Sequence, residues 1–270
     1  MRYAWLEPGQ PDDELLGDYA AIRAERYWPD DFLAETRFAG VEGVVHVQAA
    51  VGTADPVAET RWVQGFTDRL GVPQGIIAFA DLAAPDLEHV LAGHLAYPAL
   101  RGIRDLRYDG YLSDERWEAG FARLGELGLV CCDDPLLEQY PRVAALAARH
   151  PETTLCIDHA GFPRRRDREY FHTWRAELRR IADAPSTVIK ISGLGQIDHG
   201  WTMESLRPWV LACIEAFGAE RSFFGTNWPV DRLWSSYADV VDAYAALVSD
   251  FSSAEQRLLF SENANRVFRL

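Results

Sequence analysis

The chain has 270 residues, of which 48% are hydrophobic, and its formal net charge is −14 at pH 7. A chain of this length can bury one large core or two modest ones. The excess of negative charge would be repelled by nucleic acid and by anionic membranes, so we expect neither as a partner. We find no run of about 18 uncharged apolar residues and no charged-then-apolar leader, which predicts a cytoplasmic protein without a membrane span or secretory signal.

The four cysteines have no C-x-x-C spacing; they are Cys131, Cys132, Cys156 and Cys213. We therefore expect them to be small buried residues of a protein in a reducing compartment.

The first 38 residues have an irregular pattern rich in Trp, Tyr, Pro and Asp, in which Leu16–Arg26 is compatible with a short helix. After them, apolar strands alternate regularly with helices. The predicted strands cover residues 44–49, 74–79, 102–106, 129–132, 154–159, 188–192 and a last segment ending at 223–224. The predicted helices cover residues 57–70, a segment after Pro85, 114–127, 143–149, 168–181, 204–217, 237–248 and 254–266.

These elements form seven strand–helix units, the pattern of right-handed βαβ crossovers on a parallel sheet. No Pro/Gly/Ser-rich linker interrupts them, so we expect residues 1–270 to form a single α/β domain. We prefer a TIM-type (β/α) barrel, although seven units is one short of eight. A doubly wound open sheet is the alternative, but no glycine-rich phosphate loop follows the first strand.

The segment 222–231 marks the expected site. Phe223 and Phe224 end a buried strand, Gly225 permits a close backbone approach, and Pro229 prevents the strand from continuing. Asn227 therefore lies at the carboxyl end of a strand, where α/β barrels and open sheets place their chemistry. The alternative is a strand end with a turn-favouring Asn.

Alternation along the strands indicates which other side chains face the mouth of the barrel. The expected inward sets are 44/46/48, 102/104/106, 155/157/159, 188/190/192 and 223/225/227. The side chains expected to converge at the mouth are Gln48, Arg104, His159, Ser192 and Asn227. Lys190 lies one layer below Ser192 on the same face.

Each candidate also has a structural interpretation. His159 could cap the backbone, Arg104 could pair with a nearby carboxylate, and Lys190 could extend along apolar surface to reach solvent. His46 lies mid-strand, and a hydrogen-bonded core histidine is more typical there than a ligand. We expect the other histidines on the surface: His89, His94, His150, His172 and His199.

A basic run follows His159: Arg164, Arg165, Arg166 and Arg168. On a loop over the mouth it would attract an anionic substrate. The alternative is a solvated run without a function, near a helix start where positive charge is unfavourable.

The chain resembles the amidohydrolase-related family, which includes 2-pyrone-4,6-dicarboxylate lactonases and sugar-lactone hydrolases. The resemblance rests on the segments 156–163 (CIDHAGFP), 188–194 (VIKISGL) and 224–230 (FGTNWPV), with 47–50, 59–62 and 100–104 fitting in order. It implies a (β/α)₈-type barrel and hydrolysis of a lactone or related ring that often carries carboxylates, in several members without a metal.

The resemblance also implies roles for individual residues. His159 matches a histidine that polarises the carbonyl, and Arg104 matches a position that could bind a substrate carboxylate. Asn227 stands where the family has the aspartate that activates water. The remaining expected substrate-binding residues are Gln48, Lys190, Ser192 and Trp228.

The chain departs from the family pattern in two ways. The family's first strand ends in His-x-His and precedes a Tyr-x-Trp-Leu loop, whereas this chain begins at the loop, with Tyr3, Trp5 and Leu6. Asn227 cannot ionise, so it can orient water but cannot take a proton. With His159 as the only remaining histidine ligand, we expect no metal and no other cofactor. His159 or Asp231 could replace the missing base.

A missing strand would expose the edges of the first and last strands. Residues 1–8 could cover the gap, a partner chain could do so in a homo-oligomer, or the recorded start could lie downstream of the true one, the explanation we favour.

The sequence leaves three functions open. We expect a metal-independent hydrolase of a small anionic lactone or related ring. The alternatives are a non-hydrolytic lyase or isomerase of the same superfamily, for which Asn227 is no handicap, and a catalytically degenerate barrel that only binds a ligand.

Overall fold

A computed structural model describes residues 3–7, 9, 15–23, 26–50, 52–105 and 110–270. Its strands form one parallel sheet in which the order in space follows the order in the chain. The strands are β1 (Val45–Val47), β2 (Gly75–Ala78), β3 (Leu100–Arg104), β4 (Val130–Asp133), β5 (Leu155–Ile157), β6 (Thr187–Ile191) and β7 (Ser222–Phe224). All seven predicted strands are confirmed.

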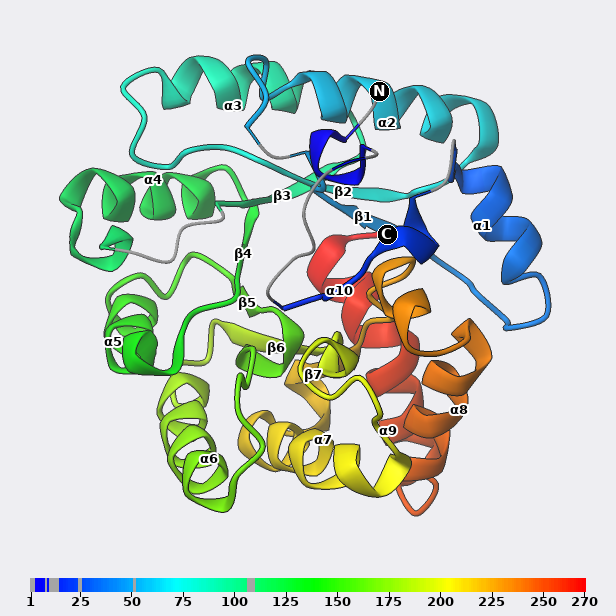
Figure 1. The fold of residues 1–270 in the computed structure, drawn as a ribbon. Helices are drawn as coiled ribbons and strands as arrows, with labels where there is room; N and C mark the ends of the chain where they lie inside the picture. The colour runs from blue at the N-terminus through cyan, green and yellow to red at the C-terminus, as the bar shows by residue number, and fades with distance from the viewer. Residues whose placement is uncertain (1–2, 8, 10–14, 24–25, 51, 106–109) are drawn as a thin grey trace.

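Helices follow the strands and surround them (Figure 1). They are α2 (Ala58–Leu70), α3 (Leu87–Leu95), α4 (Glu115–Glu126), α5 (Tyr140–Arg149), α6 (Arg168–Ala182), α7 (Met203–Phe217) and α8 (Tyr237–Leu247). Several begin at a side-chain cap, for example Asp114 on α4, Asp167 on α6 and Thr202 on α7. Over the residues described, the fold is thus a TIM-type barrel with one strand fewer than eight, as predicted.

Two segments differ from the expected elements. The predicted helix over 254–266 is divided into α9 (Ser253–Arg257), a π-helical turn (Leu258–Glu262) and α10 (Asn263–Phe268). Within Leu16–Arg26 the described residues hold only a 3₁₀ turn, Ala20–Ile22, while a short helix, α1, covers Pro29–Glu35.

Two apolar clusters show which face of each strand points inward. Cys156 and Val188 belong to the interior cluster with Phe223, whereas Leu155 and Ile157 pack in the larger cluster between strands and helices. The expected inward sets on β6 and β7 are therefore confirmed. The sets on β5 and β1 are wrong, because Cys156 rather than Ile157, and Val45 and Val47 rather than His46, face the interior. Leu106 lies outside the described residues.

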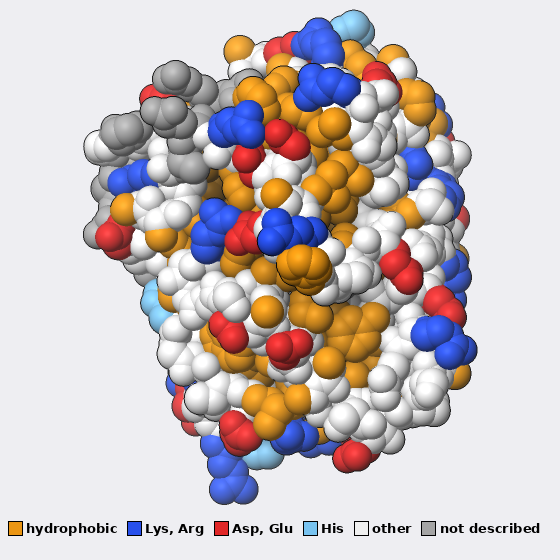
Figure 2. Space-filling view, turned by 90° about the vertical axis from the view of Figure 1, so that its right-hand side faces the viewer, with side chains coloured by type: hydrophobic (Ala, Val, Ile, Leu, Met, Phe, Trp, Pro, Cys, Tyr) orange, Lys and Arg blue, Asp and Glu red, His pale blue; other side chains and the backbone are white. Residues whose placement is uncertain are grey.

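The barrel does not close by strand pairing, since β1 and β7 are the two ends of the sheet among the described residues. Helix α1 spans this seam on one side: Trp28 packs on Phe66 of α2, and Phe32 packs on Tyr237 of α8. Figure 2 looks onto the side of the molecule where α1 and α8 lie, and hydrophobic side chains gather along the middle of that face.

The C-terminal helix α10 supports the seam from within, because Phe268 belongs to the interior cluster and contacts the ring of Phe223. The early residues lie against the end of β1, where the Trp5 indole N–H donates to the Ala49 carbonyl at 2.9 Å. Within the described chain, no helix combines the length and apolarity needed to cross a membrane.

Candidate active site

A buried carboxylate, Asp158, lies at the centre of the polar group at the carboxyl ends of the strands. It has no solvent exposure. Its Oδ1 lies 3.0 Å from Lys190 Nζ, and its Oδ2 lies 3.5 Å from Arg104 Nη1. Asp158 shares the inward face of β5 with Cys156, whose Sγ lies 3.7 Å from Oδ1. The three charged side chains come from β3, β5 and β6, so the barrel itself brings them together.

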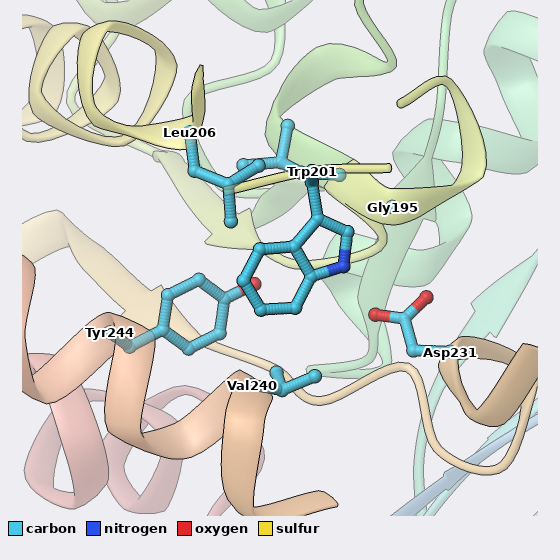
Figure 3. A pocket seen from close by; sticks show the side chains of 7 residues that line it. Gly195, Trp201, Leu206, Asp231, Val240 and Tyr244 are labelled. Carbon is cyan, nitrogen blue, oxygen red and sulfur yellow. The ribbon is translucent and has the colours of Figure 1, made fainter. Parts of the chain in front are cut away.

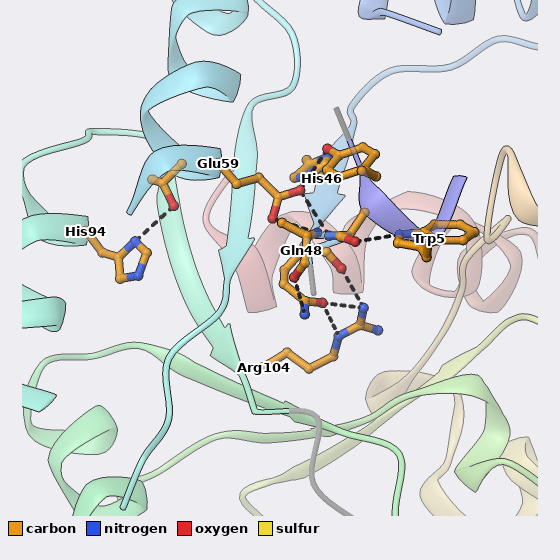
Figure 4. Close-up of polar contacts among 10 residues, drawn as sticks. Trp5, His46, Gln48, Glu59, His94 and Arg104 are labelled. Carbon is orange, nitrogen blue, oxygen red and sulfur yellow. Dashed lines mark hydrogen bonds and ion pairs between the residues drawn. The ribbon is translucent and has the colours of Figure 1, made fainter. Parts of the chain in front are cut away.

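Arg104 is held on its other side by Gln48 (Figure 4). Its Nη2 donates to both the backbone and the side-chain oxygen of Gln48 at 2.7 Å, and its Nε donates to the same side-chain oxygen at 3.2 Å. The two residues predicted to meet at the mouth therefore do meet. Gln48 fixes the plane of the guanidinium, which limits the directions in which Arg104 can present its remaining N–H groups.

The charges of this group stabilise one another. Burial alone would raise the pKa of Asp158, but nearby positive charge, first of all the Lys190 ammonium and then Arg104, holds that pKa below its usual value. Burial would lower the pKa of Lys190, but Asp158, with smaller contributions from Cys132 and Cys156, raises that pKa above its usual value. Asp158 and Lys190 are thus both charged at neutral pH, and with the guanidinium of Arg104, a permanent cation, the group carries a net charge of about +1.

His159 reaches the site through an unusual backbone turn. It lies two residues after the end of β5, and its φ of +52° places it in the left-handed region. The ring Nδ1 lies 3.0 Å from the Ser192 hydroxyl. Burial, together with Lys190 and Arg104, lowers the pKa of His159 to about 3 against the opposing effect of Asp158. The imidazole is therefore neutral at physiological pH.

Asn227 approaches the same turn from β7, also with a left-handed φ of +52°. A Cβ added to Gly193 would lie 2.6 Å from His159 Nδ1 and 3.2 Å from Asn227 Nδ2, so the two side chains flank one glycine. The Asn227 amide donates to Asp231 Oδ1 at 3.1 Å. Burial raises the pKa of Asp231 to about 7, with the Asn227 hydrogen bond acting in the opposite direction.

Asp231 also borders a small cavity (Figure 3). Its volume is about 10 Å³, roughly the space that one water molecule needs. Apolar side chains surround most of it, including Trp201, Val240 and Tyr244. A carboxylate in these surroundings has few partners, which explains its raised pKa.

The remaining predicted residues have structural contacts. The Trp228 indole N–H donates to Tyr27 at 3.0 Å and to Glu35 at 3.1 Å, so it joins the seam to α1. The basic run is dispersed: Arg165 pairs with Asp167, and Arg166 donates to the Leu194 carbonyl at 2.6 Å.

Two histidines belong to buried polar groups outside the site. His46 lies 3.0 Å from Glu59, which also accepts from Tyr3 at 2.8 Å, as expected for a hydrogen-bonded core histidine (Figure 4). His94 was expected on the surface, but it is fully buried between the Thr60 hydroxyl and the Phe79 carbonyl. The sequence gives no hint of this, because its partners are distant in the chain.

Asp158 and Asp133 are among the buried carboxylates that sequence reasoning missed. The expected inward set 155/157/159 leaves Asp158 on the outward face of its strand, although a lysine and an arginine facing inward require a negative partner. Asp133 ends β4 and accepts from Tyr111 at 2.7 Å. Burial raises the pKa of Asp133 to about 8 despite that hydrogen bond. Its position directly after an apolar strand was the available signal.

Comparison with known proteins defines the family. A family model described as Amidohydrolase (Amidohydro_2) matches residues 4–270. An L-fucono-1,5-lactonase of Burkholderia multivorans is 32% identical over 96% of this chain and 91% of its own length. An uncharacterized protein of Sinorhizobium fredii is 34% identical over 99% of this chain and 93% of its own length.

A solved structure supports the same conclusion. A crystal structure of an amidohydrolase from Burkholderia multivorans with bound zinc is 28% identical, covers 100% of this chain and 96% of its own, and superimposes with a TM-score of 0.86. The chain therefore belongs to the amidohydrolase-related family and is a hydrolase of lactonase-like type at the level of that family.

The zinc in that relative raises the question of whether this chain could hold a metal ion. Among the described residues, one group has ligand atoms close enough together: Cys132, Cys156 and Asp158, within 4.8 Å of one another. The neighbouring Cys132 thiol and burial raise the pKa of Cys156 well above its usual value, whereas zinc requires a thiolate. Asp158 is already paired with Lys190, and Arg104 adds a second positive charge. These residues do not fit a divalent cation.

Proposed function

We propose that this protein hydrolyses a small lactone that carries a carboxylate, and that it does so without a metal ion. The observation that carries the proposal is the neutral His159, held by Ser192 beside the positively charged group of Arg104, Asp158 and Lys190. This local positive charge lies in a chain with a net charge of −14. It therefore favours an anionic substrate at this position in particular.

His159 would act as a hydrogen-bond donor to the lactone carbonyl. If Nδ1 accepts from Ser192, the ring proton resides on Nε2, which can then donate to the carbonyl oxygen and stabilise the oxyanion. A pKa of about 3 makes His159 a poor base, which argues against the alternative that it activates water.

Asn227 and Asp231 would handle the water. The Asn227 Nδ2 is bound to Asp231, so its carbonyl oxygen remains to accept a hydrogen bond from the attacking water. Water adds to the lactone carbonyl carbon, its proton passes to the Asp231 carboxylate, and the ring oxygen leaves and takes up a proton. The product is the open-chain hydroxy acid. A pKa of about 7 suits Asp231 to both taking and returning that proton.

Two substrates test the proposal: L-fucono-1,5-lactone, the substrate in the name of one relative, and 2-pyrone-4,6-dicarboxylate, which carries carboxylates. With protein freed of metal by a chelator, we expect turnover above the spontaneous rate. His159→Gln should lower kcat at least 100-fold, in the range typical of a lost oxyanion donor. His172→Gln, an exposed control on α6, should leave it unchanged. Activity that appears only after zinc is added, or persists in His159→Gln, would contradict the proposal.

The carboxylate preference is tested by Arg104→Met. We expect it to raise KM for the dicarboxylate at least 10-fold more than for the uncharged lactone, because only the former loses a charge-assisted contact. An equal change for both substrates would assign Arg104 a structural role.

A non-hydrolytic reaction is distinguished by the source of oxygen in the product. In water enriched in ¹⁸O, hydrolysis places one solvent oxygen in the new carboxylate, whereas decarboxylation or isomerisation places none. Micromolar binding of either compound without turnover would favour the catalytically degenerate barrel.

A further inference from the structure

A second cavity lies at the opposite end of the barrel from the candidate active site. Its volume is about 460 Å³. Its walls include Val130 at the start of β4, Thr154 before β5 and Ser186 before β6, together with residues of α10. The active-site side chains follow the carboxyl ends of the strands, so the barrel core separates the two places. We call this second cavity the basal cavity.

Three arginines line the basal cavity, and each is held in place by the backbone. Arg221 donates to the carbonyls of Ala184 at 3.0 Å and Thr187 at 3.3 Å. Arg269 donates to the Gly128 carbonyl at 2.6 Å, and Arg266 donates to the Glu220 carbonyl and to Asn263. A guanidinium has five N–H donors, so these contacts fix each group and leave further donors.

The positive charge of these arginines exceeds the negative charge around the basal cavity. Within the part of the chain that the structure describes, none of the three forms an ion pair, whereas Arg123, Arg149 and other surface arginines do. This is unexpected in a chain with 41 acidic and 27 basic residues. One carboxylate, Glu152, also borders the cavity, but it lies 3.3 Å from His150.

Two further observations favour anion binding by this group. Arg101 donates to the Arg269 carbonyl at 3.2 Å, and burial together with the Arg269 charge lowers the pKa of Arg101. The Ser186 hydroxyl, another wall of the cavity, is buried and has no hydrogen-bond partner among the described residues. An oxyanion would relieve the repulsion and accept from the hydroxyl.

We propose that the basal cavity binds a small polyvalent oxyanion through Arg221, Arg266, Arg269 and Ser186. Fixed guanidinium groups and a hydroxyl donor are the groups that recognise phosphate and carboxylate oxygens. The ligand is independent of the lactone substrate, because it enters at the other end of the barrel. It binds only the folded state, and so raises the midpoint of thermal unfolding.

Titration calorimetry with inorganic phosphate and with citrate tests the proposal at constant ionic strength, with chloride as the control salt. We expect saturable binding of one ion per chain. Whichever of phosphate and citrate binds with the lower Kd shows whether the ligand is a phosphate or a tricarboxylate. Arg266→Met should weaken binding at least 10-fold. Arg257→Met, which removes an exposed arginine paired with Glu262, should not. Arg104→Met should also retain binding, which excludes the active site as the location.

A second variant keeps the test valid if Arg266→Met folds poorly. Ser186→Asp places a carboxylate inside the basal cavity, so it should raise the thermal midpoint without added anion and abolish the response to phosphate and citrate. Binding that is unchanged in both variants, or weaker in Arg104→Met than in Arg266→Met, would overturn the proposal. So would a response to chloride equal to that to both polyvalent anions.

Discussion

Asp158 holds a full negative charge in a position that water does not reach, and Lys190 at 3.0 Å is its nearest cation. Breaking a buried ion pair by removing one partner typically costs about 3–5 kcal/mol, because the other charge stays buried. We therefore expect Lys190→Met to lower the free energy of unfolding at pH 7 by roughly that amount. The measurement is urea denaturation.

A double variant provides the matched comparison. Lys190→Met combined with Asp158→Asn removes both charges, and it should be more stable than Lys190→Met alone. Arg180→Met breaks a surface ion pair with Glu177, and it should lower the free energy of unfolding by less than about 1 kcal/mol. If the double variant loses as much free energy of unfolding as Lys190→Met and Asp158→Asn lose together, the two charges do not stabilise each other.

Asp231 should make stability depend on pH in the opposite sense from most carboxylates. Its pKa is about 7 in the folded protein and near 3.8 when unfolded, so the folded state binds more protons between about pH 4 and 7. The contribution of Asp231 to the free energy of unfolding is therefore fully present below about pH 4 and is lost as pH rises to 7. Residue 231 does not titrate in Asp231→Asn. Relative to that variant, the free energy of unfolding of the wild type should fall by roughly 2–4 kcal/mol between about pH 4 and 7.

Urea denaturation at pH 4.5 and 7.5 measures this difference. Asp239→Asn is the control, since hydrogen bonds from Ser236 lower the pKa of Asp239 and place its titration below the window. A wild-type-to-Asp231→Asn difference that is constant with pH would show that burial does not raise the pKa of this carboxylate.

Individual residues also show where sequence reasoning ended. Alternation along a strand separates two faces, but in a parallel sheet covered by helices both faces are apolar, so it does not say which one is inside. For this reason Lys190 and Arg104 were predicted on the inward face and Asp158 was not. His159 was found despite the wrong face, because a left-handed turn, invisible in the residue pattern, returns its ring to the site.

At the scale of elements, the turn between β6 and the next 3₁₀ segment is the most restrictive part of the site. Gly193 there has a φ of +61°, and a Cβ would lie 2.3 Å from Gln196 Nε2 and 2.6 Å from His159 Nδ1. The glutamine end can move, but the buried, hydrogen-bonded imidazole has little room. We expect Gly193→Ala to lower kcat at least 10-fold with the lactone substrate, because the ring must shift.

The control is Gly71→Ala at the end of α2, where φ is +74° and a Cβ would meet nothing within 4 Å. Both variants place alanine in the left-handed region and should lose about 1–2 kcal/mol of stability. Only Gly193→Ala should lose activity. Equal activity in the two variants would mean that the turn does not position His159.

Helix and strand identities were predictable because each unit repeats the same local signals, such as Asp55 before α2, whose side chain accepts from the Val57 amide at 2.9 Å. The break in the last helix was not. The π-helical turn from Leu258 to Glu262 has no residue signature of its own, because it depends on how the chain packs against β7. Tertiary contact, rather than helix propensity, decides that element.

At the scale of the whole molecule, the number of units was predictable but the closure of the barrel was not. The seam between β1 and β7 is joined by contacts between residues almost 200 positions apart, such as Glu35 with Trp228 and Arg232. Such long-range pairs leave no periodic pattern in the chain. The bridge by α1 therefore became visible only with the structure.

The interior of the barrel supplies the last prediction. An eight-stranded barrel fills its interior with side chains from its own strands. Here α10 adds Phe268, which is 3% exposed, meets the Phe223 ring edge-on at 5.7 Å and completes the cluster that includes Ile77 and Val188. Phe268→Ala should thus lower the free energy of unfolding by about 3–5 kcal/mol, as for other large-to-small changes in a core.

Chemical denaturation of Phe268→Ala and of Phe38→Ala distinguishes a core role from a surface one, since Phe38 is 88% exposed and its variant should match the wild type. Because Val188 and Cys156 of this cluster lie one layer below Lys190 and Asp158 on the same strands, Phe268→Ala should also weaken the lactone activity at temperatures where it is still folded. A loss of less than about 1 kcal/mol would place Phe268 in a site that collapses easily. In that case β1 to β7 would fill the interior without the C-terminal helix, and α10 would serve mainly as a wall of the basal cavity.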